Sequence, residues 1–253
     1  MVGASVRIAC VVITSVGGKS RLISRDDEAS LYLRPFMYAS DVFLGVRPAS
    51  EILYLLIASP VGSYFASGVK PVSVWVSDEY TRAGPGGTGA AKCGGNYAAS
   101  LVAQAEALSH GCEQVVFLDA VHRRFVDELG GMNVFFVYHD GTLVTPELTG
   151  TILPGITRDS VIALARHSSK EIGRSITVRP RWRADAASGR LREVFACGTA
   201  AVLTPIGSVR FLDGEFTVAD GGPGEVTMSL RGQLVDIQRA RVPDPFGWVR
   251  RVL

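Results

Sequence analysis

The alternation of hydrophobic and polar positions along the chain predicts several short strands. The clearest covers residues 72–77, which read Val-Ser-Val-Trp-Val-Ser, the period of two expected when one face of a strand is buried. Continuous apolar runs at 52–58 and 115–118 are instead typical of strands buried on both faces, and 52–58 is expected to be central in its sheet. Alternation or short apolar runs predict further strands at 31–36, 134–137, 194–196, 202–206 and 208–212. Asp-Gly pairs at 140–141 and 213–214 indicate hairpin turns.

Three other stretches repeat their apolar residues at helical spacing. The first follows Asn96, a good N-cap, and ends at Gly111, and its predicted packing face consists of Tyr97, Leu101, Ala105 and Leu108. The second follows Thr157, a candidate N-cap, and continues through Val161 and Leu164. The third covers residues 225–239, and its apolar face consists of Val226, Leu230, Leu234 and Ile237.

The same patterns divide the chain into two domains. Small residues between Val61 and Lys70 indicate a linker at 62–70, which separates a small N-terminal domain at 1–61 from a larger domain at 71–253. The first 30 residues hold one short apolar run and a charged patch, to which no chemistry can be assigned. Strands and helices interleave in the larger domain, so the fold class is α/β with α+β character.

Composition excludes some classes of protein. With 47% apolar and 20% charged residues, the chain is typical of a globular protein with a substantial core. The formal net charge is +2 and no basic block stands out, so nothing argues for nucleic acid as a partner. No apolar run reaches the ~18 residues needed to cross a bilayer, which argues against a membrane protein. The run from Ile8 to Val16, behind Arg7, imitates the core of a signal peptide but has no clear cleavage pattern.

Cysteine and histidine spacing gives no sign of a metal site. The four cysteines form no CxxC pair and fit no zinc pattern; they are Cys10, Cys93, Cys112 and Cys197. The four histidines show no ligand spacing either. Unpaired cysteines are simplest to explain in a reducing compartment, so we expect a cytoplasmic protein without a structural metal.

One lysine lies between two glycine clusters in the stretch 82–97, which reads Arg-Ala-Gly-Pro-Gly-Gly-Thr-Gly-Ala-Ala-Lys-Cys-Gly-Gly-Asn-Tyr. Glycines permit φ > 0 and let the backbone approach a bound group closely. Lys92 is thereby held on a short turn before a helix, which suits a lysine that is kept partly dry and used as a nucleophile. Two alternatives stay open: a phosphate cradle, although the Gly-Lys-Ser/Thr of a P-loop is absent, and a flexible loop with a solvated lysine.

Other stretches offer charge and hydrogen-bond donors. Glu128 lies beside two glycines in a predicted turn at 127–133, where backbone can approach a ligand; the alternative is a solvated turn glutamate. The helix start at Thr157 and the small-residue turn at 197–200 offer free N–H groups to an anion, or are an ordinary cap and turn. Tyr32 and Arg34 share a strand face, and Arg34 needs either a substrate carboxylate or a structural salt bridge.

This combination of residues suits pyridoxal phosphate. A lysine can form a Schiff base with the aldehyde of the cofactor, and a carboxylate can keep its pyridine nitrogen protonated so that the ring accepts electrons. The two candidate anion sites can hold its 5′-phosphate. None of these features proves the assignment alone, and the combination carries it.

The lysine stretch also resembles a known family. Residues 86–97, Gly-Gly-Thr-Gly-Ala-Ala-Lys-Cys-Gly-Gly-Asn-Tyr, are similar to the lysine signature of branched-chain amino acid aminotransferases, which are class IV pyridoxal-phosphate enzymes of fold type IV. Four later segments match the same family in order: Asp-Glu-Leu-Gly-Gly-Met-Asn at 127–133, Thr-Pro-Glu-Leu at 145–148, Leu-Pro-Gly-Ile-Thr-Arg at 153–158 and Phe-Ala-Cys-Gly-Thr-Ala at 195–200. The resemblance covers about residues 30 to 253. It implies two domains, the second a mixed sheet or pseudo-barrel with helices.

The resemblance implies a role in cofactor binding for six residues. Lys92 would be the catalytic lysine, which bonds to the cofactor and moves the proton at the substrate α-carbon. Tyr97 would hydrogen-bond the ring oxygen of the cofactor, and Glu128 would pair with its pyridine nitrogen. The phosphate would be held by the backbone of Ile156 and Thr157, with Thr199.

The resemblance also implies the substrates. Tyr32 and Arg34 match residues that the family uses near the substrate carboxylates, and Thr199 and Ala200 would add backbone donors. The implied reaction is the reversible transfer of an amino group between L-leucine, L-isoleucine or L-valine and 2-oxoglutarate, by a homodimer with sites near its interface. Because a methylene in an apolar pocket is worth only ~1–3 kcal/mol, one enzyme is expected to accept all three amino acids.

Two departures from the family pattern matter. Ala201 and Thr204 occupy the positions of a CxxC redox pair found in some members, so redox control of that kind is not expected. Residues 1–30 do not resemble the N-terminal region of the family, and no match is found for an arginine that grips the cofactor phosphate. Losing such a bond costs roughly 10- to 150-fold in cofactor affinity, and we expect a poorly stable chain unless residues 1–30 rebuild the missing surface. The alternatives are a D-amino acid aminotransferase, an aminodeoxychorismate lyase or a catalytically impaired remnant.

Overall fold

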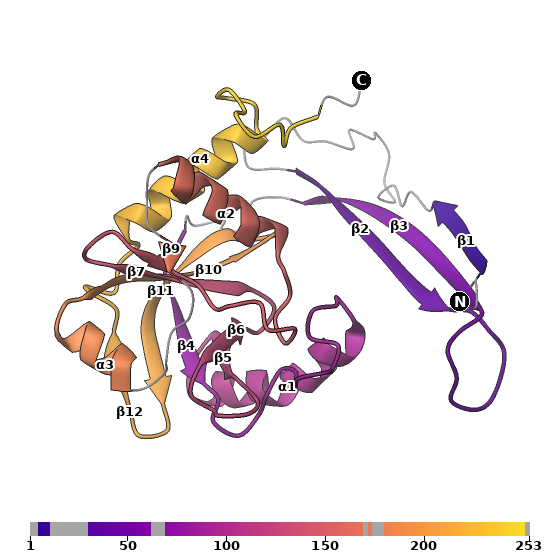
Figure 1. Cartoon of the computed structure of the whole chain (residues 1–253), viewed down its shortest axis with the longest axis horizontal. Coiled ribbons are helices and arrows are strands. Elements are labelled where there is room, and N and C mark those ends of the chain that lie inside the picture. The colour runs from indigo at the N-terminus through magenta and orange to yellow at the C-terminus, as the bar shows by residue number, and fades with distance from the viewer. Residues whose placement is uncertain (1–4, 11–29, 62–68, 169–171, 174–179, 251–253) are drawn as a thin grey trace. The chain divides into compact units, whose positions relative to one another are not determined.

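The structure, a computed structural model, describes residues 5–10, 30–61, 69–168, 172–173 and 180–250 (Figure 1). The chain divides into two compact units, Met1–Ala66 and Ser67–Leu253. The boundary between them falls within the stretch 62–70 that the sequence marks as a linker, and residues 62–68 of that linker lie outside the described residues.

The first unit is a three-stranded sheet. β3 (Glu51–Val61) lies in its centre, with β1 (Ser5–Cys10) parallel on one side and β2 (Ser30–Ala39) antiparallel on the other. The prediction of a central strand at 52–58 is confirmed, but the expected burial on both faces is wrong, because residues 51–58 are only half-buried. The described part of this unit contains no helix that could cover the sheet.

The second unit is built on a mixed sheet with the strand order β6-β5-β4-β11-β10-β7-β8-β9, and β12 pairs with β11. Parallel pairing joins β4 to β5 and to β11, and joins β8 to β9, whereas the other pairs are antiparallel. Both predicted Asp-Gly hairpins are present, and the predicted strands are too, except that those at 202–206 and 208–212 form the single strand β11. The strands are β4 (Val72–Val76), β5 (Gln114–Leu118), β6 (Val126–Leu129), β7 (Asn133–Tyr138), β8 (Leu143–Val144), β9 (Ile172–Gly173), β10 (Leu191–Gly198), β11 (Val202–Phe211) and β12 (Gly214–Thr217).

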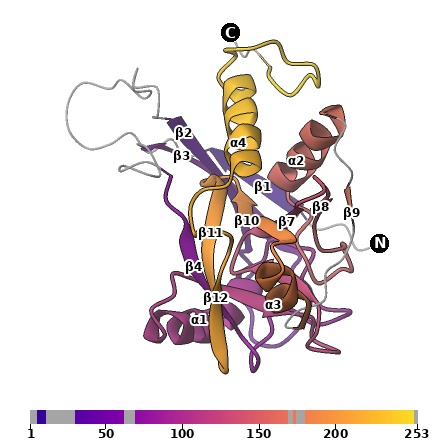
Figure 2. The ribbon, with the colours of Figure 1, turned by 90° about the vertical axis from the view of Figure 1, so that its left-hand side faces the viewer.

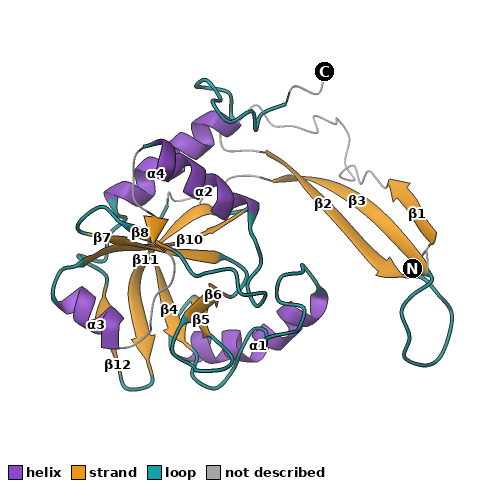
Figure 3. Cartoon of the chain, viewed as in Figure 1, coloured by secondary structure: helices purple, strands orange, loops and turns teal. Residues whose placement is uncertain are grey.

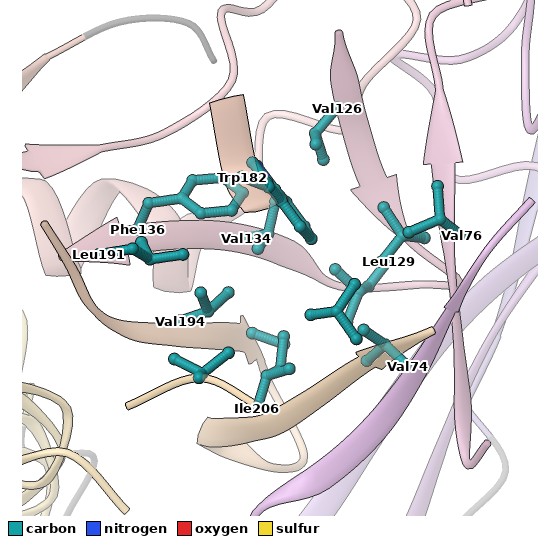
Figure 4. Close-up of a cluster of buried hydrophobic side chains, with 14 of the residues drawn as sticks. Val74, Val76, Val126, Leu129, Val134, Phe136, Trp182, Leu191, Val194 and Ile206 are labelled. Carbon is teal, nitrogen blue, oxygen red and sulfur yellow. The ribbon is translucent and has the colours of Figure 1, made fainter. Parts of the chain in front are cut away.

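This sheet curls around an apolar interior. The edge strand β6 turns directly into β7, and a bridge between Leu129 and Met132 joins the two, so the curled sheet nearly closes. Alternate residues of its strands point inward and pack with Trp182 (Figure 4). The interior includes Val74, Val76, Val126, Leu129, Val134, Phe136, Leu191, Val194 and Ile206. The expected α/β class with a mixed, pseudo-barrel second domain is confirmed.

Helices cover the outer faces of the curled sheet (Figures 2 and 3). α1 (Gly94–Ser109) packs on β4 and β5, whereas α2 (Ile156–His167) and α4 (Glu225–Gln238) pack together on β7, β10 and β11. α3 (Pro180–Ala187), which the sequence pattern does not predict, carries Trp182 into the interior. The apolar face predicted for α4 is confirmed for Leu230, Leu234 and Ile237, which are buried.

The packing face predicted for α1 is wrong. Leu101 and Leu108 are 66% and 62% exposed, and the helix turns small side chains such as Ala103 and Ala107 to the sheet. The physical reason lies on the sheet side of the contact, where Trp75 and Phe117 fill the space, so that α1 lies close to the strands and has room only for short side chains. The spacing of the large apolar residues along α1 therefore points to the exposed face and not to the buried one.

Candidate functional site

The glycine-rich loop before α1 is held from within the helix. The Asn96 side chain donates to the carbonyls of Thr88 (2.7 Å) and Ala91 (2.9 Å), and the Thr88 hydroxyl donates back to its amide oxygen (2.7 Å). The prediction that Asn96 is the N-cap is thus wrong: Cys93 holds that position, without a side-chain cap bond, and Asn96 lies in the first turn. Asn96 therefore fixes the loop from which Lys92 projects.

Lys92 is exposed in this structure, so the expected partly dry environment is not present. Its Nζ lies 5.6 Å from the centroid of the half-buried Tyr97 ring. That ring in turn lies against the β6–β7 turn, because a Cβ added to Gly131 would come within 3.3 Å of its edge. Lys92 and Tyr97 are therefore neighbours on the side of the sheet where β6 turns into β7.

Glu128 lies on β6 and not in a turn, which corrects the prediction for residues 127–133. It pairs with Phe117, whose side chain packs under α1, so the carboxyl group emerges on the α1 side of the sheet. With only 1% of its surface exposed it is not a solvated glutamate. Its Oε2 accepts a hydrogen bond from the Leu153 N–H (3.2 Å) and forms an ion pair with Arg82 (3.2 Å).

Burial raises the pKa of Glu128 to about 7, and the Arg82 guanidinium opposes that shift. The neighbouring Asp127 is the extra residue of a β-bulge in the β5–β6 pair and points elsewhere, where it accepts from the Thr151 hydroxyl (2.9 Å). Burial also raises the pKa of the Asp127 carboxyl. Two adjacent carboxyl groups are thus buried on this strand, and both hold the segment that contains Thr151 and Leu153.

The segment 151–153 connects these groups to α2. Asn133, at the start of β7, donates to the Leu153 carbonyl (2.9 Å), and Arg82 donates to the Thr151 carbonyl (2.8 Å). The glycine-rich loop before α1, which carries Lys92 and which we call the lysine loop, also meets this segment. The two backbones touch, since a Cβ added to Gly89 would lie 2.5 Å from Thr151. The lysine loop, β6 and the start of α2 are therefore connected through residues 151–153, which we call the 151–153 joint.

The N-terminus of α2 follows this joint. The prediction that Thr157 is the N-cap of α2 is wrong. Gly155 occupies that position, without a side-chain cap bond, and Thr157 lies in the first turn. α4 also begins after a glycine, but there the Glu193 carboxylate accepts from the N–H groups of Val226 (2.8 Å) and Thr227 (2.7 Å). The first amides of α4 are thus bound by a carboxylate of the protein, whereas the N-cap of α2 contributes no side-chain cap of its own.

The Glu193 cap predicts a stability effect. The Glu193→Ala substitution removes a buried carboxylate that accepts three hydrogen bonds, one of them from the Thr227 hydroxyl (2.7 Å). Unfolding in urea should show a loss of about 3 kcal/mol. Glu215→Ala is the matched control, because its ion pair with Arg210 is exposed and should contribute less than ~1 kcal/mol. Equal losses for the two variants would contradict the capping role.

The turn after β10 lies at the same end of the sheet. Cys197 pairs with Asn133 across β10 and β7, and a Cβ added to Gly198 would lie 3.2 Å from Met132. The predicted turn of small residues is present, with Thr199 and Ala200 both exposed. The candidate residues of the second unit thus come from the lysine loop, β6, the start of α2 and the end of β10, which all meet around the β6–β7 turn.

Tyr32 and Arg34 belong to the first unit, on β2. They share a face as predicted, with the Arg34 guanidinium 5.0 Å from the centroid of the Tyr32 ring. Arg34 is exposed, so the inference that a half-buried strand forces it to have an acidic partner is wrong. Exposed guanidinium groups are satisfied by water.

Two buried residues that contact the 151–153 joint, Arg82 and Asp127, have no role in the sequence-based prediction. Arg82 opens the glycine-rich stretch, but nothing in its neighbours signals that it is buried or names its partners. Asp127 lies in a recognised motif, yet only the bulge explains why it and Glu128 face different groups. A cavity of about 300 Å³ opens beside Asp127, between residues 119–126 and 146–149, and not beside Lys92.

The described residues contain neither a metal-binding cluster nor a membrane-spanning helix. Over the described ranges, no three histidine, cysteine, aspartate or glutamate side chains are grouped so as to hold a metal ion. None of the helices in the described part of the chain combines the length and apolar character needed to span a bilayer.

Comparison with known proteins adds the following. A family model described as amino-transferase class IV matches residues 20–209. The branched-chain-amino-acid aminotransferase of Mycolicibacterium smegmatis is 58% identical over 228 residues, which are 89% of this chain and 62% of that protein. The chain therefore spans about three fifths of the length of the curated relatives it matches.

Solved structures of branched-chain amino acid aminotransferases resemble this one, and two are compared below. The branched-chain amino acid aminotransferase of Escherichia coli is 33% identical, with a TM-score of 0.75 over 88% of this chain and 70% of that one. The branched-chain amino acid aminotransferase of Thermobaculum terrenum, solved in its PLP-form, is 29% identical, with a TM-score of 0.68 over 84% of this chain and 65% of that one.

Proposed function

The chain belongs to the amino-transferase class IV family, and we propose that within this family it is a branched-chain amino acid transaminase that uses pyridoxal 5′-phosphate. The observation that carries the proposal is the 151–153 joint. It connects a buried carboxylate, a glycine-rich lysine loop and the start of α2, where the N-cap residue makes no side-chain cap bond. The names of the relatives supply the substrates, and we extend them to this chain as part of the proposal.

The residues present fit this cofactor. Glu128 can hold a proton at the pyridine nitrogen with the carboxylate oxygen that neither Arg82 nor Leu153 contacts. The N–H groups of Ile156 and Thr157 at the start of α2, with Thr199 from the turn after β10, can bind the phosphate. When bound, the cofactor supplies an aldehyde for amines and a ring that accepts electrons.

The remaining residues act on the substrate in this proposal. Lys92 would hold the cofactor through its amine, and as a free amine it would move the proton at the substrate α-carbon. Tyr97, whose ring lies beside Lys92, orients the cofactor through a hydrogen bond to the ring oxygen. Backbone N–H groups at Thr199 and Ala200 bind the substrate α-carboxylate. The roles of Tyr32 and Arg34 and the homodimer, which the resemblance implies, stay predictions. So does the cytoplasmic location, which is expected from the unpaired cysteines.

An amino-transfer assay tests the proposal. The purified chain is loaded with pyridoxal phosphate and given 2-oxoglutarate with L-leucine, L-isoleucine or L-valine, and glutamate formation is followed. We expect measurable transfer from all three, because a methylene in an apolar pocket changes efficiency by no more than about 200-fold. Transfer from D-alanine without transfer from L-leucine would replace the proposal by a D-amino acid aminotransferase. Release of an aryl amine from aminodeoxychorismate would replace it by a lyase.

The cysteine beside Lys92 gives a test that does not need turnover. A hydrogen bond with the Thr88 hydroxyl lowers the pKa of Cys93, whereas burial raises the pKa of Cys112 and Cys197. In a Cys10→Ser background, iodoacetamide should therefore label Cys93 first. Bound pyridoxal phosphate should slow that labelling about tenfold or more, as measured by mass spectrometry. Labelling of Cys93 that is unchanged by the cofactor would contradict binding at Lys92.

A further inference from the structure

Arg82 lies where three segments of the second unit meet. Only 5% of its surface is exposed, and one terminal nitrogen, Nη1, makes all three contacts described for it. It donates to the carbonyls of Gly89 (3.1 Å) and Thr151 (2.8 Å) and forms the ion pair with Glu128 Oε2 (3.2 Å). One guanidinium therefore connects the lysine loop, the 151–153 joint and β6.

A guanidinium buried this deeply depends on its partners for stabilisation. Removing a charge from water costs several kcal/mol, and only close partners offset that cost. Two of the partners are backbone carbonyls of segments that already touch, because Gly89 leaves no room for a Cβ against Thr151. A lysine is a poorer fit at this depth, since its compact ammonium group is more strongly hydrated than a guanidinium and loses more on burial.

We infer that Arg82 is a positioning residue of the proposed cofactor site, which fixes the Glu128 carboxylate and the lysine loop against the 151–153 joint. It thereby sets the spacing between Glu128, Lys92 and the start of α2. This inference rests on the proposed function, because that spacing matters only if one ligand spans all three. The ion pair also occupies a single carboxylate oxygen of Glu128, so the other stays available to that ligand.

The charges around Glu128 make the role measurable. Arg82 and Lys92 favour its charged form, whereas Asp127 on the same strand disfavours it. Cys197 of β10 is the further titratable group near the carboxylate. Burial is the largest influence on the pKa of Glu128 and raises it, and Arg82 is the largest opposing influence. Without Arg82, the carboxyl group should stay protonated to higher pH.

The test compares Arg82→Met and Arg82→Lys with the parent chain, first without cofactor. Infrared spectroscopy of chains with ¹³C-labelled glutamate follows the Glu128 carboxyl group, whose band is assigned by its loss in Glu128→Gln. The midpoint of its titration should rise by about one pH unit or more in Arg82→Met. Arg82→Lys keeps the charge, so its midpoint should move less, but hydrogen exchange at residues 84–93 and 151–153 should be faster in both variants.

The second arm measures the affinity for pyridoxal phosphate. Both variants should bind it about tenfold or more weakly than the parent, whereas Arg183→Met should bind it normally. Arg183 is a matched control because it is a half-buried arginine whose ion pair, with the exposed Asp213, lies outside the proposed site. Arg82→Lys also covers the case in which Arg82→Met fails to fold.

The outcomes separate the two claims. An unchanged titration and unchanged exchange without cofactor would overturn the positioning role, whatever the cofactor does. Shifts in the cofactor-free chain together with a parent that binds no pyridoxal phosphate would support the contacts of Arg82 and overturn the proposed cofactor. Shifts without any change in cofactor affinity would overturn the role in the site.

Discussion

Replacing Lys92 with alanine is expected to abolish both amino transfer and the visible absorbance of lysine-bound pyridoxal phosphate. The residue provides the amine that bonds to the cofactor and the base that moves the substrate proton, so turnover should fall by about 10³-fold or more. The fold should survive, because Lys92 is exposed and its one described contact is with the Tyr97 ring at 5.6 Å. We therefore expect the free energy of unfolding to change by less than ~0.5 kcal/mol. Absorbance titration, a leucine assay and urea unfolding measure the three quantities.

Lys70→Ala provides the control for this experiment. The chain has four lysines, and Lys70 is the other one among the described residues, exposed just before β4. Pyridoxal phosphate labels accessible lysines non-specifically, so a band that needs Lys92 but not Lys70 identifies the site. A band that persists in Lys92→Ala at full intensity would place the cofactor elsewhere and end the proposed assignment.

The candidate residues that sequence predicted share a local signature. Lys92 stands between glycines, Glu128 precedes two glycines, and the turn at Thr199 is made of small residues. Glycine-rich turns mark places where backbone must bend sharply or come close to another group, so the signal needs no knowledge of distant contacts. The structure then explains one of these glycines directly, since Gly89 meets the backbone of Thr151.

Other features could not be predicted because they depend on partners far away in the sequence. Arg82 and Thr151 are 69 positions apart, and only the folded sheet brings them together. Asn96 is a good N-cap by composition, yet the carbonyls of the lysine loop compete for its amide and win. The buried face of α1 depends on how much space Trp75 leaves under the helix, which no periodicity within α1 contains.

Glu128 makes the stability of the cofactor-free chain fall as pH rises toward neutrality. Burial raises the pKa of its carboxyl group from 4.5 to about 7 in the folded chain. Below pH 4.5 the group is protonated in both states and the contribution to stability is full. Between the two values only the unfolded chain loses the proton, so the free energy of unfolding falls as the pH rises, and the loss of about 3 kcal/mol is complete above about pH 7. Urea unfolding between about pH 5 and 8 measures the slope.

The Glu128→Gln variant tests both the titration and the proposed role. An amide does not ionise in this range, so most of the slope should disappear, and the raised pKa of Asp127 should leave a smaller slope of the same sign. The variant should still bond pyridoxal phosphate through Lys92, but it cannot keep a positive charge at the pyridine nitrogen. Turnover should therefore fall by about 10²- to 10³-fold while the absorbance band remains. A parent-like slope would mean that another carboxyl group titrates here, and parent-like turnover would mean that Glu128 does not meet the ring nitrogen.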